Sequence, residues 1–171
     1  MDLKACIRTI PDFPEPGISF KDITPVLADP VVFSWIIDAF AERYLGCIDA
    51  IVAIESRGFL VGAPLAYKLG LPLAVARKKG KLPFDTHEVS YELEYGSAVL
   101  EIHTDAVSKG ARVLVIDDLL ATGGTASAVL ELVNKLGGEA VECAFIVDLV
   151  FLGGAQRLAP VLCFSLTSYE A

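Results

Sequence analysis

The sequence contains few of the residues on which metal-dependent and nucleophilic hydrolases depend. Its 171 residues include two histidines, His87 and His103, and four scattered cysteines. It has no Cys-x-x-Cys pair, no HExxH motif and no GxSxG motif, and neither histidine has an evident catalytic partner. These absences exclude a zinc site with the usual ligand spacing and most familiar hydrolase templates.

Basic residues and long apolar runs are also scarce. The chain has 22 acidic and 14 basic side chains, a formal net charge of −8 at pH 7 and a pI near 4.7. This balance argues against a general partner for nucleic acids or for anionic membranes. No apolar stretch approaches the roughly 20 residues of a membrane span, and the N-terminus does not resemble a secretory signal. With four cysteines that form no framework, these features predict a cytoplasmic protein with reduced thiols.

What is present is enough apolar sequence for one folded domain over residues 1–171, because hydrophobic residues make up 54% of the chain. Apolar runs of strand length alternate with segments of helical spacing. We expect strands at 50–54, 73–76, 98–102, 112–116 and 144–147, and helices at 30–44, 58–69 and 129–136. This alternation predicts an α/β fold with a mostly parallel central sheet flanked by helices, in which ligands bind at the carboxyl ends of strands.

Two segments depart from the alternation. Residues 78–96 are polar, contain Gly80 and Pro83, and are expected to form a flexible lid loop. Residues 10–17 carry three prolines and a glycine, so we expect an ordered loop there, held in place by Phe13 and Phe20.

The strongest chemical signal is the segment 113–125, VLVIDDLLATGGT, which runs from an apolar strand through two acids into a turn that opens a helix. Glycines let the backbone approach an anion, and a helix N-terminus offers unpaired N–H groups. Asp117 and Asp118 can accept hydrogen bonds from sugar hydroxyls beside that anion. The segment predicts a ribose 5-phosphate site; the alternative is that the glycines only turn the chain and the acids only cap the helix. In the first case a side chain at Gly123 would occupy the space that the phosphate needs.

A second cluster is basic. Glu55-Ser56-Arg57-Gly58 follows the 50–54 strand, and Arg77, Lys78, Lys79 and Lys81 follow the next one. In an acidic protein such a cluster is suited to a polyanionic leaving group such as pyrophosphate. The alternative for Lys78 and Lys79 is an ordinary solvated loop.

The 13-residue segment resembles the phosphoribosyl-pyrophosphate (PRPP) signature of type I phosphoribosyltransferases, and no Walker A or GxGxxG motif competes with it. Within that family the chain is similar to the adenine phosphoribosyltransferases nearly end to end. The segments that carry the likeness are Phe13–Ile18, Phe20–Ile23, Glu55–Phe59, Gly80–Pro83, Leu93–Gly96, Asp117–Thr125 and Phe164–Leu166.

The resemblance implies an enzyme of purine salvage that converts adenine and PRPP to AMP and pyrophosphate. It implies Mg²⁺ carried by PRPP or pyrophosphate without direct protein ligands, a homodimer, and a small N-terminal hood over residues 1–28 that covers the purine. It also implies a non-proline cis peptide within residues 55–57.

The resemblance assigns site residues as well. Glu94 would exchange a proton with adenine and act catalytically with Arg57, and Ala121 stands where 6-oxopurine enzymes usually carry aspartate. The implied PRPP and AMP site is Asp117, Asp118, Ala121, Thr122, Gly123, Gly124, Thr125 and Ala126. The implied pyrophosphate site is Ser56, Arg57, Arg77, Lys78, Lys81 and Tyr95, with Tyr95 also shielding the reaction. The implied adenine site is Ser19, Phe20, Lys21 and Leu119.

Two other functions stay open from the sequence. One is a phosphoribosyltransferase for another base, which Ala121 disfavours. The other is a non-catalytic PRPP or nucleotide sensor on the same fold, which lacks support because no DNA-binding domain is appended and the net charge is negative. For Glu94, the alternative is an exposed carboxylate on a strand that takes no part in the reaction.

We expect Glu94→Gln to lower the rate of AMP formation while PRPP affinity changes less, because an amide keeps the shape but cannot exchange a proton. Acid–base groups contribute on the order of 10²–10⁴-fold to rate. Single-turnover assays measure the effect, and near-normal turnover would leave Glu94 without an acid–base role.

Overall fold

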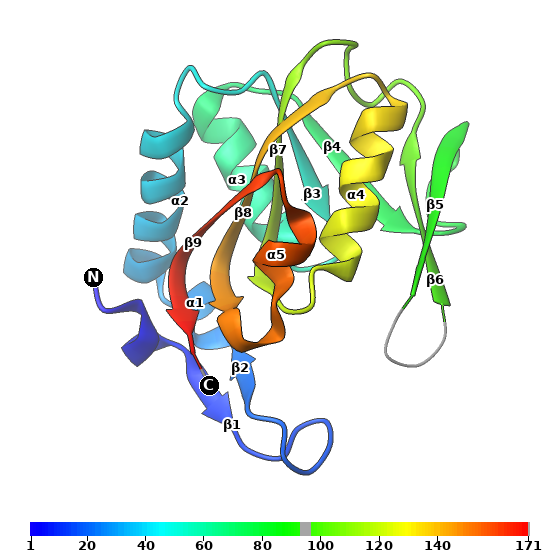
Figure 1. Ribbon diagram of the computed structural model, residues 1–171. Coiled ribbons are helices and arrows are strands. Elements are labelled where there is room, and N and C mark those ends of the chain that lie inside the picture. Colours follow the sequence, from blue (N-terminus) through cyan, green and yellow to red (C-terminus); the bar gives the residue numbers. More distant parts are fainter. Residues whose placement is uncertain (93–96, 171) are drawn as a thin grey trace.

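The computed structural model describes residues 1–92 and 97–170 and has a central sheet with helices on both faces (Figure 1). The strands are β1 (Arg8–Ile10), β2 (Phe20–Asp22), β3 (Ala50–Ile54), β4 (Leu73–Lys78), β5 (Thr86–Glu92), β6 (Ser97–His103), β7 (Arg112–Leu120), β8 (Glu139–Leu149) and β9 (Leu162–Tyr169). The α-helices are α1 (Thr24–Ala28), α2 (Pro30–Tyr44), α3 (Gly58–Leu69), α4 (Gly124–Lys135) and α5 (Gly154–Leu158), and short 3₁₀ turns are η1 (Leu3–Cys6) and η2 (Val150–Leu152).

The main sheet has the strand order β5-β6-β4-β3-β7-β8-β9. Strands β4, β3, β7, β8 and β9 are parallel, whereas β5 and β6 add an antiparallel hairpin at one edge. Two helices follow strands at one end of the sheet, α3 after β3 and α4 after β7. The predicted mostly parallel α/β fold is confirmed, and the segments expected to bind ligands follow β3 and β7 at this end of the sheet.

Several predicted elements are confirmed with the same bounds. The strand at 50–54 is buried at every position, as a strand covered on both faces must be. The helix at 58–69 is α3, and the helix at 30–44 is α2. Helix α2 begins after Asp29, whose Oδ1 accepts the N–H groups of Val31 at 2.9 Å and Val32 at 3.1 Å.

Two buried cores cover the two faces of the sheet. One joins α2 and α3 to residues such as Ile51, Leu114 and Ile146, and the other joins α4 to Val52, Val115 and Phe145. In Figure 1, α2 and α3 lie on one side of β3 and β7, with α4 on the other. Among the described residues, no helix is both long and apolar enough to cross a membrane.

The predicted strand at 112–116 is longer than its apolar run. The sequence predicts residues 112–116, but β7 continues to Leu120 because β8 pairs with it as far as Asp148. The two acids at 117 and 118 therefore lie inside the strand's last residues. Pairing with a neighbouring strand fixes their directions.

The prediction of a lid loop over 78–96 needs correction, because residues 86–92 form β5. This strand pairs with β6 in antiparallel register from Thr86 opposite His103 to Glu92 opposite Ser97. The sequence does not predict β5 because its residues are mostly polar, but Val89 of β5 is buried in the core that contains α4. Residues 86–92 of the segment are thus one strand of a hairpin with β6, which follows the segment, and residues 93–96 lie outside the described part.

The N-terminal segment forms a small hairpin that is separate from the main sheet. Strand β1 pairs with β2, and in Figure 1 this hairpin lies beyond the arrowheads of β8 and β9. Phe13 packs edge-on against Phe20 with ring centroids 5.1 Å apart, which confirms the expected pinning of the proline-rich loop. Strand β9, which the sequence did not reveal, holds the hairpin through Lys21, whose Nζ lies 4.4 Å from the Tyr169 ring centroid.

The packing of α3 on β3 generates a testable prediction at Gly62. A Cβ at this position would lie 2.7 Å from the Ala53 Cβ, so Gly62→Ala forces the helix away from the sheet. Alanine gains about 1 kcal/mol of helix propensity over glycine, but overpacking costs about 1–3 kcal/mol, so we expect lower stability. Thermal unfolding measures it, with Lys68→Ala on the exposed face of α3 as control; a higher Tm for Gly62→Ala would contradict the packing.

Candidate active site

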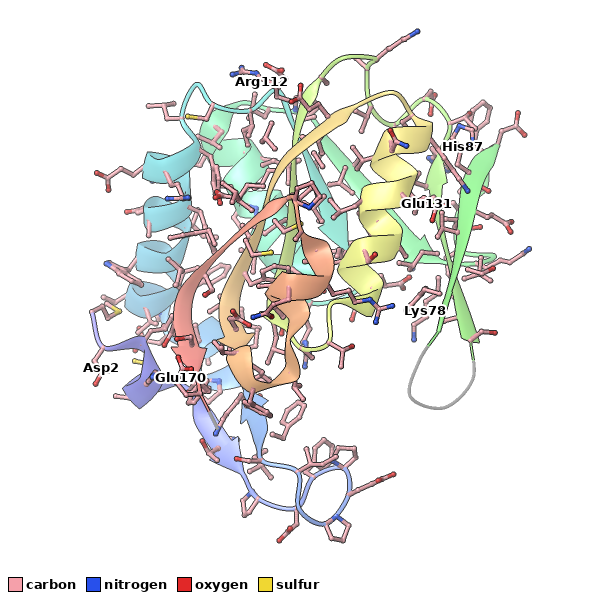
Figure 2. All side chains as sticks on the ribbon, in the orientation of Figure 1. Asp2, Lys78, His87, Arg112, Glu131 and Glu170 are labelled. Carbon is pink, nitrogen blue, oxygen red and sulfur yellow. The ribbon has the colours of Figure 1, made fainter. Side chains whose placement is uncertain are left out.

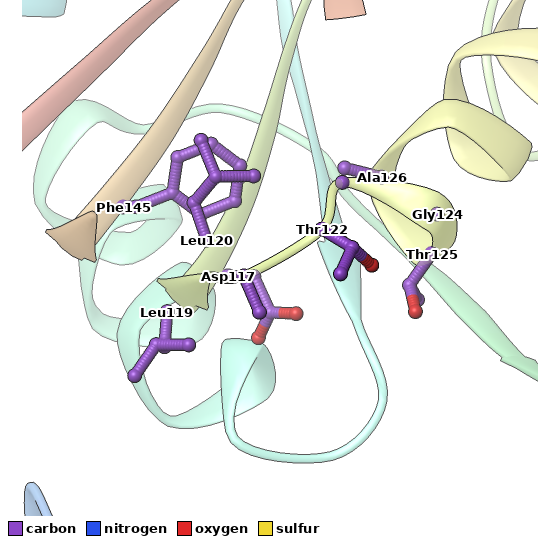
Figure 3. Close-up of a pocket in the computed structure, with 10 residues that line it drawn as sticks. Asp117, Leu119, Leu120, Thr122, Gly124, Thr125, Ala126 and Phe145 are labelled. Atoms are coloured by element: carbon purple, nitrogen blue, oxygen red, sulfur yellow. The ribbon is translucent and has the colours of Figure 1, made fainter. Parts of the chain in front are cut away.

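A polar pocket of about 90 Å³ lies where β7 turns into α4 (Figure 3). Figure 3 shows the side chains of Asp117, Thr122 and Thr125 beside this turn. The lining residues are Asp117, Leu119, Leu120, Ala121, Thr122, Gly123, Gly124, Thr125, Ala126 and Phe145. The structure thus brings together seven of the eight residues expected to hold the phosphoribosyl group, all except Asp118.

The pocket is built around the start of α4. Gly123 adopts a left-handed conformation, with φ of 76°, and no side chain caps the helix. The first N–H groups of a helix have no partner within it, so here they are available to an anion. The hydroxyls of Thr122 and Thr125 add donors at the same turn, so the arrangement is suited to a phosphate.

The structure adds a packing reason for glycine at position 123 to the predicted one. A Cβ on Gly123 would lie 2.9 Å from the carbonyl oxygen of Gly154, at the start of α5. A Cβ on Gly154 would in turn overlap Leu120 and the carbonyl oxygen of Ala121. Gly154 therefore packs closely against the backbone of the turn. The sequence analysis did not identify Gly154, although the pair Gly153-Gly154 after a strand is a signal for close backbone packing.

The two acids of the motif face different partners. Asp117 lines the pocket, and its Oδ1 accepts the backbone N–H of Asp118 at 2.8 Å. Asp118 is 3% exposed, and its Oδ2 lies 2.8 Å from Arg57 Nε, although the two groups are not aligned as a hydrogen bond. The sequence predicts that both acids bind the ribose hydroxyls. In the structure Asp117 lines the pocket, whereas Asp118 is paired with Arg57.

Burial, together with the neighbouring Asp118 carboxylate, raises the pKa of Asp117 well above its usual value. A carboxyl held in this way is destabilised when ionised and gains from a ligand that donates hydrogen bonds to it. Displaced pKa values of this kind cluster at functional sites.

The turn after β3 carries Arg57 toward the same end of the sheet. The expected non-proline cis peptide is present between Glu55 and Ser56. Besides meeting Asp118, the Arg57 guanidinium lies 6.0 Å from the centroid of the Phe20 ring in the N-terminal hairpin. Arg57 therefore links the end of β7 to the hairpin.

Glu55 connects this turn to the basic loop after β4. Its two oxygens accept Arg77 Nη2 at 3.0 Å and the backbone N–H of Lys78 at 2.8 Å. Arg77 also donates to the carbonyl oxygen of Lys81 at 3.2 Å, and Lys79 pairs with Glu88 at 2.7 Å. Arg77, expected to bind pyrophosphate, is thus engaged in holding the loop.

The residues expected to contact adenine lie on two elements. Ser19, Phe20 and Lys21 are at the start of β2, and Leu119 lines the pocket at the end of β7. Lys21 Nζ donates to Ser19 Oγ at 3.1 Å and to Thr9 Oγ1 at 3.2 Å, and it lies over the Tyr169 ring. The Lys21 side chain thus stabilises the β1–β2 hairpin and its contact with β9. Glu94 and Tyr95 lie outside the described residues.

Comparisons with known proteins agree with this geometry. Residues 21–161 match the phosphoribosyl transferase domain, which defines the class of fold and site. A curated relative from Geobacter metallireducens, "Adenine phosphoribosyltransferase", is 55% identical over 98% of this chain and 99% of its own length.

Solved structures give the same result. The adenine phosphoribosyltransferase of Thermoanaerobacter pseudethanolicus is 50% identical, with a TM-score of 0.94 and 98% of each chain covered. The Saccharomyces cerevisiae enzyme, solved with an imino-altritol bisphosphate and adenine, is 40% identical with a TM-score of 0.92 and 96% of each chain covered. The chain belongs to the phosphoribosyltransferase family and, within it, to the adenine phosphoribosyltransferases.

The raised pKa of Asp117 predicts that Asp117→Asn is more stable than wild type at neutral pH. The folded state holds the Asp117 proton more tightly than the unfolded chain, so wild-type stability falls as pH rises from the unfolded pKa through the folded one. Asparagine has no such loss and can still accept the Asp118 N–H.

Thermal unfolding of Asp117→Asn and wild type from about pH 4 to 8 tests this, with the Tm difference growing as pH rises. We expect PRPP affinity to fall at the same time, by about 1–3 kcal/mol for one lost charge-assisted hydrogen bond. A Tm difference that does not change with pH would contradict the assigned environment.

Proposed function

We propose that this chain transfers the 5-phosphoribosyl group of PRPP to adenine, giving AMP and pyrophosphate. The observation that carries the proposal is the pocket at the start of α4, where uncapped N–H groups and two threonine hydroxyls lie beside Asp117. The full-length similarity to adenine phosphoribosyltransferases supports the choice of base.

The phosphate of PRPP binds in the turn 121–126. Backbone N–H groups of the first turn of α4 donate to the phosphate oxygens, together with the hydroxyls of Thr122 and Thr125. Asp117 accepts hydrogen bonds from the ribose hydroxyls, and Asp118 acts through Arg57, which it holds at 2.8 Å. The sugar is thereby fixed with its anomeric carbon facing away from the phosphate.

Pyrophosphate leaves from the side that carries the basic loop. Ser56, Arg57, Lys78, Lys81 and Tyr95 stabilise the charge that builds on it, while Arg77 holds the loop through Glu55 and Lys81. This charge stabilisation is greatest in an oxocarbenium-like transition state, when the bond to the leaving group is breaking.

Mg²⁺ belongs to this proposal as part of the substrate. Among the residues that the structure describes, no group of three or more His, Cys, Asp or Glu side chains is arranged to hold a metal ion. Mg²⁺ is commonly held through substrate phosphates with several of its waters retained, so it fits a chain that binds the magnesium complex of PRPP.

Adenine lies between the N-terminal hairpin and the end of β7. Phe20 and Leu119 supply apolar contact, the backbone of residues 19–21 contacts the purine edge, and Glu94 exchanges the proton of the ring nitrogen. The yeast relative was solved with adenine bound, which supports this base. Ala121 places a methyl group in the pocket, where an aspartate would serve a 6-oxopurine.

The organisation of the protein is also part of the proposal. Residues 1–171 form one domain, with residues 1–28 as the hood and residues 78–96, which include strand β5, as the lid. A homodimer is supported by the apolar side chains that α2 and α3 expose, Val31 at 69%, Leu60 at 48% and Tyr67 at 91%. A cytoplasmic location is supported by the free state of all four cysteines.

We expect nucleotide formation with adenine and not with hypoxanthine, guanine or orotate, when each base is offered separately with PRPP and Mg²⁺. Chelation of Mg²⁺ should abolish the reaction, and Lys68→Ala, far from the pocket on α3, should leave it unchanged. Chromatographic detection of each nucleotide decides the outcome. PRPP binding without turnover on any base would favour the sensor, and turnover on another base would correct the specificity.

A further inference from the structure

A buried carboxylate lies beneath the basic loop, on a strand that the proposed reaction does not otherwise use. Glu101 is in the middle of β6 and is 3% exposed. Its Oε1 accepts the backbone N–H groups of Lys81 and Leu82, each at 2.8 Å. A carboxylate this deeply buried is costly unless hydrogen bonds or charges compensate for the lost water.

The compensation comes mainly from the loop's own backbone. Burial acts to raise the pKa of Glu101, but hydrogen bonds from the N–H groups of Gly80, Leu82 and Lys81, with the positive charge of Lys79, hold it below its usual value. The group is therefore ionised at neutral pH. The Glu101 carboxylate orders the turn at residues 79–82, because a hydrogen bond from a backbone N–H to a buried carboxylate is stronger than one to water.

This turn is connected to the pocket by a continuous set of contacts. Asp118 holds Arg57, and Glu55, two residues before Arg57, holds Arg77 and the backbone of Lys78. Arg77 reaches across to the carbonyl oxygen of Lys81. Glu101 holds the far side of the same turn, and β6 places it directly opposite Arg77 in the β4–β6 register.

The loop has little apolar support apart from Phe84, whose ring packs edge-on against His103 with ring centroids 5.9 Å apart. Its chain runs from the end of β4 to β5 without an apolar side chain in either buried core, and Lys78, Lys79, Gly80 and Lys81 are all exposed. Figure 2 shows Lys78 on the side of the molecule that carries the β5–β6 hairpin. The direction in which Lys78 and Lys81 point therefore depends largely on polar contacts, which are those of Glu55 and Glu101 and the hydrogen bond from the Lys79 N–H to the Val99 carbonyl oxygen at 3.0 Å.

We propose that Glu101 is a positioning residue for the pyrophosphate end of PRPP, which fixes the turn at residues 79–82 so that the loop's cations and N–H groups face the leaving group. This inference rests on the proposed function and extends it to a residue that touches no substrate. It assigns the two carboxylates complementary tasks: Glu55 sets the start of the loop and Glu101 sets its end.

The test compares three variants. Glu101→Ala removes both hydrogen bonds, whereas Glu101→Gln keeps an oxygen that can accept both N–H groups and removes only the charge. Glu88→Gln is the matched control, because Glu88 lies directly opposite Glu101 in the β5–β6 register but is exposed. It pairs with Lys79 and not with the turn's backbone.

The first readout is amide hydrogen exchange of Lys81 and Leu82 without any substrate. We expect exchange to speed up about tenfold or more in Glu101→Ala and to change less than about threefold in Glu101→Gln and Glu88→Gln. Unchanged protection of both amides in a folded Glu101→Ala variant would overturn the inference. This readout stands even if the protein uses another base or none.

The second readout separates positioning from general stability. With adenine and PRPP as substrates, we expect Glu101→Ala to raise KM for PRPP about 10–100-fold, because misplaced binding groups have effects of this size, while KM for adenine stays within about twofold. Glu101→Gln should restore most of the PRPP affinity. Equal changes in both KM values, or no rescue by glutamine, would overturn the inference.

A folding failure leaves the question testable. If circular dichroism shows that Glu101→Ala does not fold, Glu101→Asp replaces it, since the shorter side chain keeps the charge but cannot reach the turn. Wild type that fails to bind magnesium pyrophosphate in calorimetry would contradict the proposed function, while hydrogen exchange would still decide what Glu101 does.

Discussion

A helix that begins at a left-handed glycine without a capping side chain must leave its first N–H groups to water or to a ligand. Helix α4 begins in this way after Gly123, whereas α3, which also has no side-chain cap, has the N–H groups of Phe59 and Leu60 bonded to the carbonyl oxygens of Ser56 and Arg57. Both N-termini lie at the carboxyl end of the same parallel strands, β3 and β7. The uncapped start of α4 and its threonine-rich turn make this edge of the sheet suited to an anion, and the contact between Gly123 and Gly154 holds the turn in place.

Acidic side chains hold the basic ones in place. Asp118 meets Arg57, Glu55 meets Arg77, and Glu101 binds the backbone of the turn that carries Lys81. A chain with a net charge of −8 thereby presents a local positive surface to a polyanion. Asp118 and Glu101 are buried and Glu55 is half-buried, so these carboxylates hold Arg57, Arg77 and the backbone of the turn, while the side chains of Lys78 and Lys81 are exposed.

The hairpins at the two edges have a different physical basis from the sheet. Strands β3 and β7 are secured by apolar burial on both faces, whereas β1–β2 is held by a few contacts, Phe13 on Phe20 and Lys21 on Tyr169. Segments with few buried apolar contacts are the ones that open and close most easily. The β5–β6 hairpin differs from β1–β2, because Val89, Leu100 and Ile102 belong to the buried core that contains α4.

Much of this was determined by the sequence alone. The buried strand at 50–54, α2 and α3 were predicted with their bounds because continuous apolar runs and helical spacing are local signals. The PRPP segment was likewise readable, because a strand, two acids and a glycine-rich turn are consecutive in the chain. Tertiary structure decided the rest, because it depends on neighbours that are distant in sequence. Asp117 and Asp118 are the same residue type, and only the two faces of β7 give them different neighbours. Arg77 is bonded by Glu55, which is distant from it in sequence. Glu101 contacts the turn only because β6 pairs with β4. Polar β5 and edge strand β9 lack a strong local pattern, so only strand pairing could define them.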